Sequence, residues 1–498
     1  MTFNSTSFLV FFPIVVLIFF LIPQRGKNIW LLICSYYFYM SWNPKYMFLI
    51  AISTLITWSV GLLIGKADRQ ASESRKNRLK KVCLAFGLTS NLAILAFFKY
   101  SSFFMRNLSS VLSRMNIEFH TPLWDILLPV GISFYTLQAI GYTIDVYRGT
   151  IKPTENLLEY ALFISFFPQL VAGPIERSKN LLRQFKGPHF FDSERVIKGI
   201  LLMAWGFYKK LVIADRAALL VTPIYSSFES YNSIQILMAT VVFAIQIYCD
   251  FSGYSDIAIG AAQVLGFHLM DNFHSPYFAA SVSEFWHRWH ISLSTWLRDY
   301  LYIPLGGNRA GKWKKYRNIM ITFCISGLWH GAGWGYVIWG VLNGLYQVIG
   351  DFTKPFRIQI QKLLGVNTKC WSYRFFQGTL TFILIDFSWV FFRADSLRAA
   401  LNMIKRTVTD FEIVFILVNE NVIGTLPLEA ADFVVLLLSI TVLLIVDLLK
   451  DKIHFRTVLL QQNLVFRFVV YYVIIWVIAI FGIYGPEYNA STFIYFQF

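Results

Sequence analysis

Apolar runs long enough to cross a membrane recur along the whole chain, and they constrain its fold more than any other feature. They lie at 7–22, 29–41, 46–65, 82–104, 126–146, 234–249, 318–339, 336–350, 376–392, 433–449 and 467–484. Only 14% of the residues are charged, against about 25% in a soluble domain. Backbone N–H and C=O groups in lipid must form hydrogen bonds within their own segment, so crossing segments of this kind are helices. The sequence predicts an all-α polytopic membrane protein with about eleven transmembrane helices, folded as one domain over residues 1–498.

The basic residues indicate how the chain is oriented in the membrane. Most of them lie in short loops, and the loop between 46–65 and 82–104 is rich in lysine and arginine. Such loops face the cytoplasm, so counting the spans places the N- and C-termini outside. The net charge of +16 therefore fits loops beside a lipid bilayer and gives no reason to expect a nucleic-acid partner.

Three stretches in the middle of the chain are less regular. Leu157–Val171 is apolar but short, which favours a re-entrant or interfacial segment. Val196–Ala214 could cross the membrane or lie flat on it. The polar stretch Asp250–Asp256 follows the apolar run 234–249 and predicts a break in that helix.

His330 is the one side chain in the apolar run Asn318–Trp339 whose ordinary pKa lies between 5 and 8. If a helix starts near Asn318, His330 lies roughly 18 Å along it, within a hydrocarbon core of about 30 Å. An ionisable side chain at that depth is costly and marks a candidate functional site. The alternative is a structural histidine bonded to a neighbouring carbonyl.

A second histidine, His290, lies in the stretch Ser283–Leu301. On a helix, His290 shares one face with Trp286 and Trp289, while Arg288 falls on the opposite, polar face. This pattern predicts an amphipathic helix at the membrane interface, with His290 facing inward. The alternative is that His290 is a packed ring without a chemical role.

Metal and nucleotide chemistry find little support in the sequence. Glu284 and His287 have the spacing of half a di-metal site, but the chain has no second such motif. Phosphate-binding glycine loops and the nucleophile elbow of serine hydrolases are absent as motifs. We predict no metal and no bound cofactor.

Several motifs together resemble the membrane-bound O-acyltransferase family, most closely its bacterial polysaccharide branch. They are Gln169–Ile175, Tyr248–Asp256, Glu284–Trp286, Arg288–Ser294, Trp296–Tyr300, Gly327–Gly331 and Phe493–Phe498. The sequence departs from the family pattern at His287, where arginine is common, and at Asn343, where histidine is common.

The resemblance implies acyl transfer from a thioester to a hydroxyl group, in a central tunnel lined by His330 and His290. A neutral imidazole can accept the hydroxyl proton, and burial keeps a histidine neutral near pH 7. We assign His330 as the base and His290 as its partner, which orients a substrate or stabilises the oxyanion. Weaker candidates for the tunnel wall are Asp250, Ser252, Tyr254, Trp329 and Trp286. For Asp250, Ser252 and Tyr254, a polar helix break remains an equal alternative.

The basic residues before the His330 helix are candidates for docking the donor. They are Arg309, Lys312, Lys314 and Lys315. They could attract an acidic or phosphorylated donor, or could simply hold the loop in the cytoplasm. The donor would be acetyl-CoA or an acyl carrier protein, and these two remain open.

The resemblance also implies the setting in which the protein works. We expect the bacterial cytoplasmic (inner) membrane, contact with lipid, and an acceptor outside the cell such as alginate, another exopolysaccharide, peptidoglycan or teichoic acid. A separate extracytoplasmic acetyltransferase is an expected partner. Two other classes stay open: a transporter or flippase of an acylated intermediate without transferase chemistry, and a scaffold for assembly.

Overall fold

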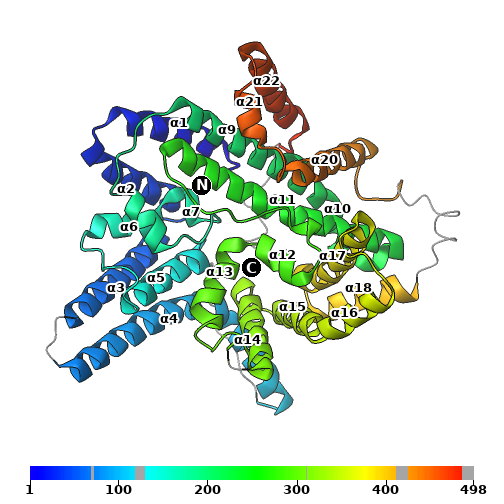
Figure 1. The fold of residues 1–498 in the computed structure, drawn as a ribbon, viewed down its shortest axis with the longest axis horizontal. Helices are drawn as coiled ribbons and strands as arrows, with labels where there is room; N and C mark the ends of the chain where they lie inside the picture. The colour runs from blue at the N-terminus through cyan, green and yellow to red at the C-terminus, as the bar shows by residue number, and fades with distance from the viewer. Residues whose placement is uncertain (69–71, 118–128, 310, 411–423, 485–498) are drawn as a thin grey trace. The chain divides into compact units, whose positions relative to one another are not determined.

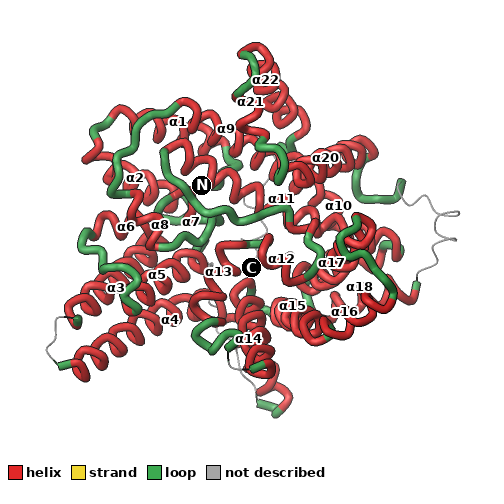
Figure 2. The backbone as a smooth tube through the Cα atoms, viewed as in Figure 1, coloured by secondary structure: helices red, strands yellow, loops and turns green. Residues whose placement is uncertain are grey.

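The computed structural model describes residues 1–68, 72–117, 129–309, 311–410 and 424–484. Within these ranges every regular element is a helix, as Figure 2 shows, so the predicted all-α fold is confirmed. Two predictions fall partly or wholly on other residues. The start of the span 126–146 and the terminal motif Phe493–Phe498 lie outside the described residues.

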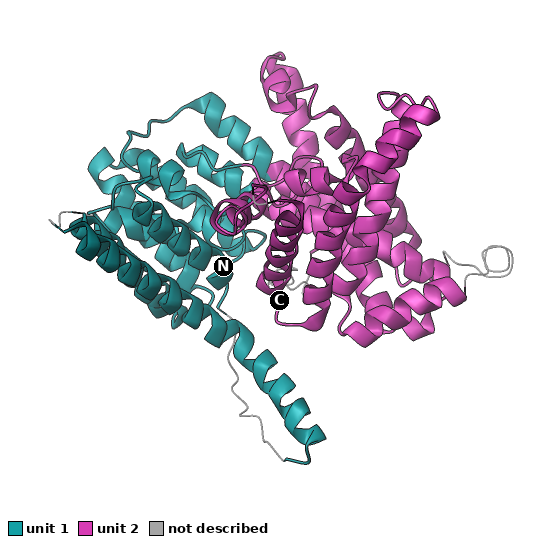
Figure 3. Ribbon diagram, turned by 60° about the horizontal axis from the view of Figure 1, so that its bottom comes forward, with its two compact units in different colours: residues 1–203, 257–270 teal, residues 204–256, 271–498 magenta. Residues whose placement is uncertain are grey.

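The chain divides into two compact units, coloured in Figure 3. Unit 1 comprises Met1–Met203 and Ile257–Met270. Its helices are α1 (Thr6–Leu21), α2 (Gln24–Met40), α3 (Tyr46–Ala67), α4 (Glu73–Arg114), α5 (Ile132–Tyr147), α6 (Leu157–Ser165), α7 (Phe167–Leu170), α8 (Ser178–Gln184) and most of α9 (Ser193–Phe207). α3 packs against α4 and α5, and α2 packs against α6. The run Leu157–Val171 forms two short helices, too short to cross a membrane, as its length predicts.

Unit 2 comprises Ala204–Asp256 and Asp271–Phe498 and contains both candidate histidines. Its elements begin with the π-helix η1 (Tyr208–Ala214), α10 (Asp215–Ser226), η2 (Phe228–Ser230), most of α11 (Ser233–Leu265), η3 (Pro276–Phe278), α12 (Val282–Arg288), α13 (Ile291–Leu297) and the π-helix η4 (Arg298–Tyr302). They continue with α14 (Lys312–His330), α15 (Trp334–Phe352), α16 (Lys354–Leu363), α17 (Trp371–Arg393), α18 (Leu397–Thr409), α20 (Ala430–Leu449), α21 (Phe455–Leu460) and α22 (Leu464–Phe481). Figure 1 labels most of these helices. The prediction of a single domain stays a prediction.

Six of the described helices are long and apolar enough to cross a membrane: α3, α4, α11, α17, α20 and α22. α22 buries none of its residues, and large apolar side chains such as Val465 and Phe468 are exposed along it. An apolar surface of this kind suits lipid. The chain is a multi-pass membrane protein, while about eleven crossings and a central tunnel stay predictions.

The expected break after residue 249 is wrong, because α11 runs without interruption from Ser233 to Leu265. Its polar side chains at 250–256 face lysines that another segment supplies. Lys210 of η1 lies 2.6 Å from Asp250, and Lys209 lies 2.8 Å from Asp256. Since these partners satisfy the polar groups within the fold, the helix does not need to open to water there.

The run Asn318–Trp339 does not form one helix, which corrects the expected position of His330. α14 starts at Lys312 and ends at His330, and α15 begins at Trp334. Between them, Gly331 has an extended backbone, and a Cβ atom at this position would lie 2.1 Å from the ring of Tyr336. The glycine-rich link therefore turns the chain, and α14 and α15 pack together as a hairpin. His330 lies at the closed end of this hairpin.

Gly327→Ala should destabilise this hairpin. A Cβ atom at Gly327 would lie 2.3 Å from the carbonyl oxygen of Tyr336, so the two helices would have to move apart. We expect the free energy of unfolding to fall by about 1–3 kcal/mol, measured by denaturation in detergent. Gly350→Ala in α15 is the matched control, because its Cβ would meet no atom within 4 Å. Equal stability of the two variants would contradict close packing at Gly327.

Candidate active site

The stretch predicted as one amphipathic helix is two short helices, with His290 between them. α12 ends at Arg288 and α13 begins at Ile291. His290 has the left-handed conformation, with φ 44° and ψ 53°. This conformation costs of order 1–3 kcal/mol in a residue other than glycine, and it turns the chain where a straight helix would continue. The predicted inward face is nevertheless buried, since Trp286, Trp289 and His290 are all largely inaccessible.

The turn and the hairpin bring the two candidate histidines together. The imidazole rings of His290 and His330 have their centroids 6.2 Å apart. His290 is fully buried and His330 is 3% exposed. Trp329 lies beside both, at 5.8 Å from His290 and 5.0 Å from His330. Residues forty positions apart in the sequence thus form one site inside unit 2.

Aromatic rings enclose both imidazoles. Trp339 of α15 lies 5.0 Å from His330 and Phe392 of α17 lies 5.5 Å from it, both edge-on. Phe251 of α11 meets His290 at 4.6 Å, with the ring planes perpendicular. Such packing excludes water and fixes the orientation of each ring.

Burial changes the acid–base character of His290. His290 lies in a turn outside the six candidate spans, and burial lowers the pKa of its imidazole from 6.5 to about 3. At physiological pH this ring is therefore neutral, with one N–H donor and one nitrogen acceptor. A ring of this kind can donate a hydrogen bond to a developing oxyanion, but it is a weak base.

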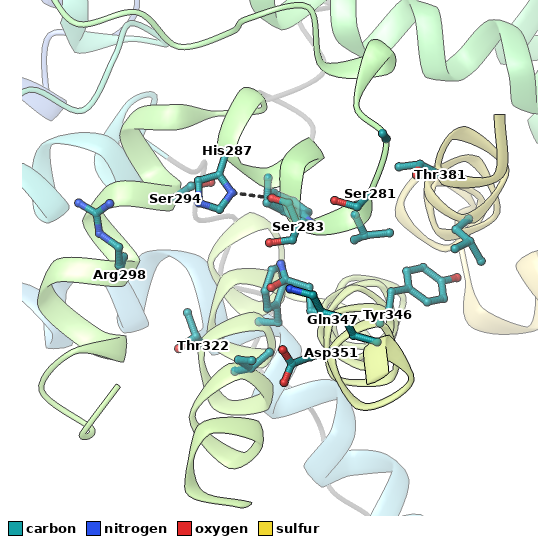
Figure 4. A pocket seen from close by; sticks show the side chains of 18 of the residues that line it. Ser281, Ser283, His287, Ser294, Arg298, Thr322, Tyr346, Gln347, Asp351 and Thr381 are labelled. Atoms are coloured by element: carbon teal, nitrogen blue, oxygen red, sulfur yellow. Dashed lines mark hydrogen bonds between the residues drawn. The ribbon is translucent and has the colours of Figure 1, made fainter. Parts of the chain in front are cut away.

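A cavity of about 790 Å³ lies beside this site, within unit 2 (Figure 4). Its walls come from α12 to α17, and polar side chains such as Ser281, Ser294 and Gln347 line it. Arg298, Lys315, Lys354 and Arg357 contribute positive charge, and Asp351 is the one acidic residue among those that line it. We call this space the basic cavity. Its lining has the composition expected of a site for an anionic ligand.

The basic cavity extends along the α14–α15 hairpin from its open end toward His330 at its closed end. Lys315 and Asp351, which form an ion pair of 2.8 Å, lie near its open end and line the cavity. Along α14 the lining continues to Ser326, one helical turn before His330. Trp286 also lines the cavity, and its ring lies 5.6 Å from that of Trp339, which contacts His330.

The structure places the predicted residues in different surroundings. Trp286 and Lys315 line the basic cavity, whereas Trp329 packs beside both histidines. Arg309, Lys312 and Lys314 are exposed and do not line the cavity. Their role in donor docking stays a prediction. Among the described residues no group of His, Cys, Asp and Glu could hold a metal ion.

Asp250 and Ser252 belong to a buried polar network. Lys210 donates to Asp250 at 2.6 Å and to Asp215 at 2.8 Å. Lys209 donates to Ser252 at 2.8 Å and also contacts Asp256. Tyr254 is fully buried on the same helix. These contacts join the π-helix η1 to α11, so Asp250 and Ser252 have clear structural partners, and their place in a tunnel wall stays a prediction.

The sequence reasoning missed several of these residues. Lys209 and Lys210 could have been found, because paired lysines inside an apolar run are costly unless they have acidic partners. Lys354 and Arg357 could not, because only the fold brings α16 to the cavity wall. Asn343, noted as a departure from the family pattern, accepts a hydrogen bond of 3.2 Å from the Trp286 indole.

Comparisons with known proteins indicate the family of the chain. A model of the membrane-bound O-acyltransferase family matches residues 152–363, which include both histidines. The chain is 39% identical over 405 residues to a probable alginate O-acetylase, AlgI, of Pseudomonas syringae pv. tomato, covering 81% of this chain and 74% of the relative. It is 36% identical over 442 residues to a peptidoglycan O-acetyltransferase of Helicobacter pylori, covering 82% and 79%.

A more distant relative has a related activity. The chain is 31% identical over 238 residues to a teichoic acid D-alanyltransferase of Streptococcus thermophilus, covering 45% of this chain and 56% of that protein. The relatives named here are therefore all acyl-transferring enzymes. Because the matches to the alginate and peptidoglycan relatives cover most of both chains, the chain belongs to the membrane-bound O-acyltransferase family and is an O-acyltransferase.

Proposed function

We propose that the enzyme transfers an acetyl group from a cytoplasmic thioester to a hydroxyl group of an extracytoplasmic polysaccharide such as alginate, or of a partner protein. The observation that carries the proposal is the pair of buried imidazoles, 6.2 Å apart, in an aromatic enclosure. Acetyl transfer to a carbohydrate also agrees with the names of the alginate and peptidoglycan relatives.

In this proposal His330 is the general base and later the general acid. Its neutral ring takes the proton of the acceptor hydroxyl as that oxygen attacks the thioester carbonyl carbon. The carbonyl oxygen gains negative charge, and the N–H group of neutral His290 stabilises it. The C–S bond then breaks, and the protonated His330 returns the proton to the leaving sulfur. The products are an ester and a free thiol.

The basic cavity suits the distal part of the thioester donor. Both candidate donors carry phosphate groups at a distance from the sulfur, and arginine and lysine bind phosphate through charge-assisted hydrogen bonds. The cavity cations lie near the open end of the hairpin, while His330 lies at the closed end. From Lys315 to His330 the helix rises about 22 Å, so the donor needs a long, thin arm between its phosphate and its thioester.

The basic loops indicate on which side of the membrane the donor and the acceptor lie. The basic residues at the start of α14 face the cytoplasm by the positive-inside rule, which puts the donor on that side of the bacterial inner membrane. The termini and the acceptor lie outside. An acyl carrier protein would dock on the cytoplasmic face, and a separate acetyltransferase outside would complete the transfer. A transporter without chemistry fits less well, since the relatives named above are transferases.

The test measures thiol release by the purified enzyme in detergent, with acetyl-CoA and an acetylated carrier protein offered separately. We expect one donor to be consumed without an ion gradient. The double variant Lys354→Ala/Arg357→Ala should raise the KM for that donor by about tenfold or more with little change in kcat, because it removes binding rather than chemistry. The matched control is Lys362→Ala, an exposed cation on α16 that does not line the cavity.

Two results would overturn parts of this proposal. If the enzyme releases no thiol from either donor, even with an acceptor oligosaccharide present, the thioester mechanism fails. If Lys354→Ala/Arg357→Ala behaves like Lys362→Ala with the donor that is consumed, the basic cavity does not bind the donor.

A further inference from the structure

The start of α13 has an unusual cap. The first N–H groups of a helix need acceptors, and the side chain of the N-cap residue usually provides one. In α13 the N-cap residue is His290, and its imidazole does not cap the helix. A residue remote in sequence takes over this task.

Asn272 supplies the missing acceptors. Its backbone oxygen accepts a hydrogen bond of 2.9 Å from the N–H group of Ile291. Its side-chain oxygen Oδ1 accepts from the N–H of Ser292 at 3.3 Å and from its hydroxyl at 2.9 Å. Asn272 is itself 1% exposed. Three hydrogen bonds thus fasten one buried residue to the two positions that follow His290.

α11 anchors both Asn272 and the imidazole. The Asn272 side-chain nitrogen Nδ2 donates to the hydroxyl of Ser255 at 3.1 Å. Phe251 lies one helical turn before Ser255, and its ring packs edge-on against His290 at 4.6 Å. One face of α11 therefore fixes the turn through Asn272 and the ring through Phe251.

We infer that Asn272 is a positioning residue that caps α13 in place of His290, holds His290 in its left-handed conformation and so directs the imidazole toward His330. The inference rests on the proposed role of His290 in acyl transfer. It explains why a residue other than Ser, Thr, Asp or Asn can occupy this N-cap. Because Asn272 accepts the hydrogen bonds at the start of α13, the side chain at position 290 can face the active site instead of capping the helix.

The test compares kinetics of acetyl transfer for Asn272→Ala, His290→Ala and the double variant, each normalised to folded enzyme. We expect Asn272→Ala to lower kcat by about 10²-fold, because an error of about 1 Å at a reacting group has this effect, with donor KM unchanged. In the His290→Ala background the same change should have little further effect, since Asn272 acts through His290. Asn272→Asp should recover most of the activity, because a carboxylate keeps the acceptor for Ser292 and can accept from the Ser255 hydroxyl.

Asn91→Ala in α4 controls for the loss of a buried amide. Asn91 is also 1% exposed, and its side chain accepts a hydrogen bond from Ser53 and donates one to the Gly87 carbonyl. Asn91→Ala should lower the free energy of unfolding without changing kcat per folded molecule. If Asn272→Ala does the same while His290→Ala is inactive, the inference fails. If His290→Ala is as active as the wild type, the proposed role of His290 fails instead.

Discussion

His330→Ala should lower the rate of acetyl transfer by about 10²–10⁴-fold, the usual contribution of a general base. The imidazole is the group that can accept the hydroxyl proton at the closed end of the α14–α15 hairpin, 6.2 Å from its proposed partner. The measurement is thiol release from the consumed donor, followed as kcat and KM. Because the loss belongs to the chemical step, kcat should fall and the donor KM should stay near the wild-type value.

Two further variants separate chemistry from packing. His330→Gln fills much of the same space between Trp339 and Phe392, but an amide cannot accept the proton, so it should be as inactive as His330→Ala. His274→Ala removes a half-exposed histidine that pairs with Asp451, and it should leave the rate unchanged. Substantial activity in both His330 variants would remove this residue from the mechanism.

Lys210→Met should destabilise the protein by about 3–5 kcal/mol, the cost of breaking a buried ion pair by removing one partner. Lys210 is 1% exposed and donates to both Asp250 and Asp215, so the substitution leaves two buried carboxylates without their cation. Asp250→Asn should cost less, because Lys210 keeps Asp215 and the amide oxygen still accepts a hydrogen bond. Denaturation in detergent measures both.

A surface pair provides the control for Lys210. The Glu194 side chain is 65% exposed and pairs with Lys198. Glu194→Gln removes this carboxylate and should change the free energy of unfolding by no more than about 0.5 kcal/mol. A Lys210→Met protein as stable as Glu194→Gln would mean that the network does not hold η1 against α11. If Asp250→Asn instead keeps its stability but loses activity, Asp250 belongs to the substrate path.

The helices were predictable from the sequence wherever one segment determines its own structure. The apolar runs at 46–65 and 433–449 correspond closely to α3 and α20, because length and hydropathy act locally. The breaks were not predictable in this way. α11 continues through Asp250 because Lys210 comes from another segment, and α14 ends at His330 because Gly331 lies against the ring of Tyr336. The first depends on a contact between segments distant in the sequence, and the second depends on how α15 packs back against the end of α14.

The residues of the candidate site also divide into those that a local pattern reveals and those that only the fold brings together. His330 and His290 could be selected singly, since a titratable group in an apolar run is costly and an inward aromatic face is visible on a helical wheel. Their proximity requires the turn at His290 and the end of α14 to meet in three dimensions. Asn272 gave no signal, because it lies in a segment without helical or strand periodicity and acts through partners on α11 and α13.

The aromatic enclosure of His330 has a consequence for the length of the acyl chain. Trp329, Trp339 and Phe392 lie within 5.5 Å of the imidazole, and Trp339 stacks in turn on Trp389. A two-carbon group would displace less of this wall than a longer chain would. A fatty-acyl chain would have to displace a buried indole, and emptying such a packed position costs about 3–5 kcal/mol. We therefore expect the wall to favour short acyl groups by steric exclusion, before any contact with the acceptor contributes.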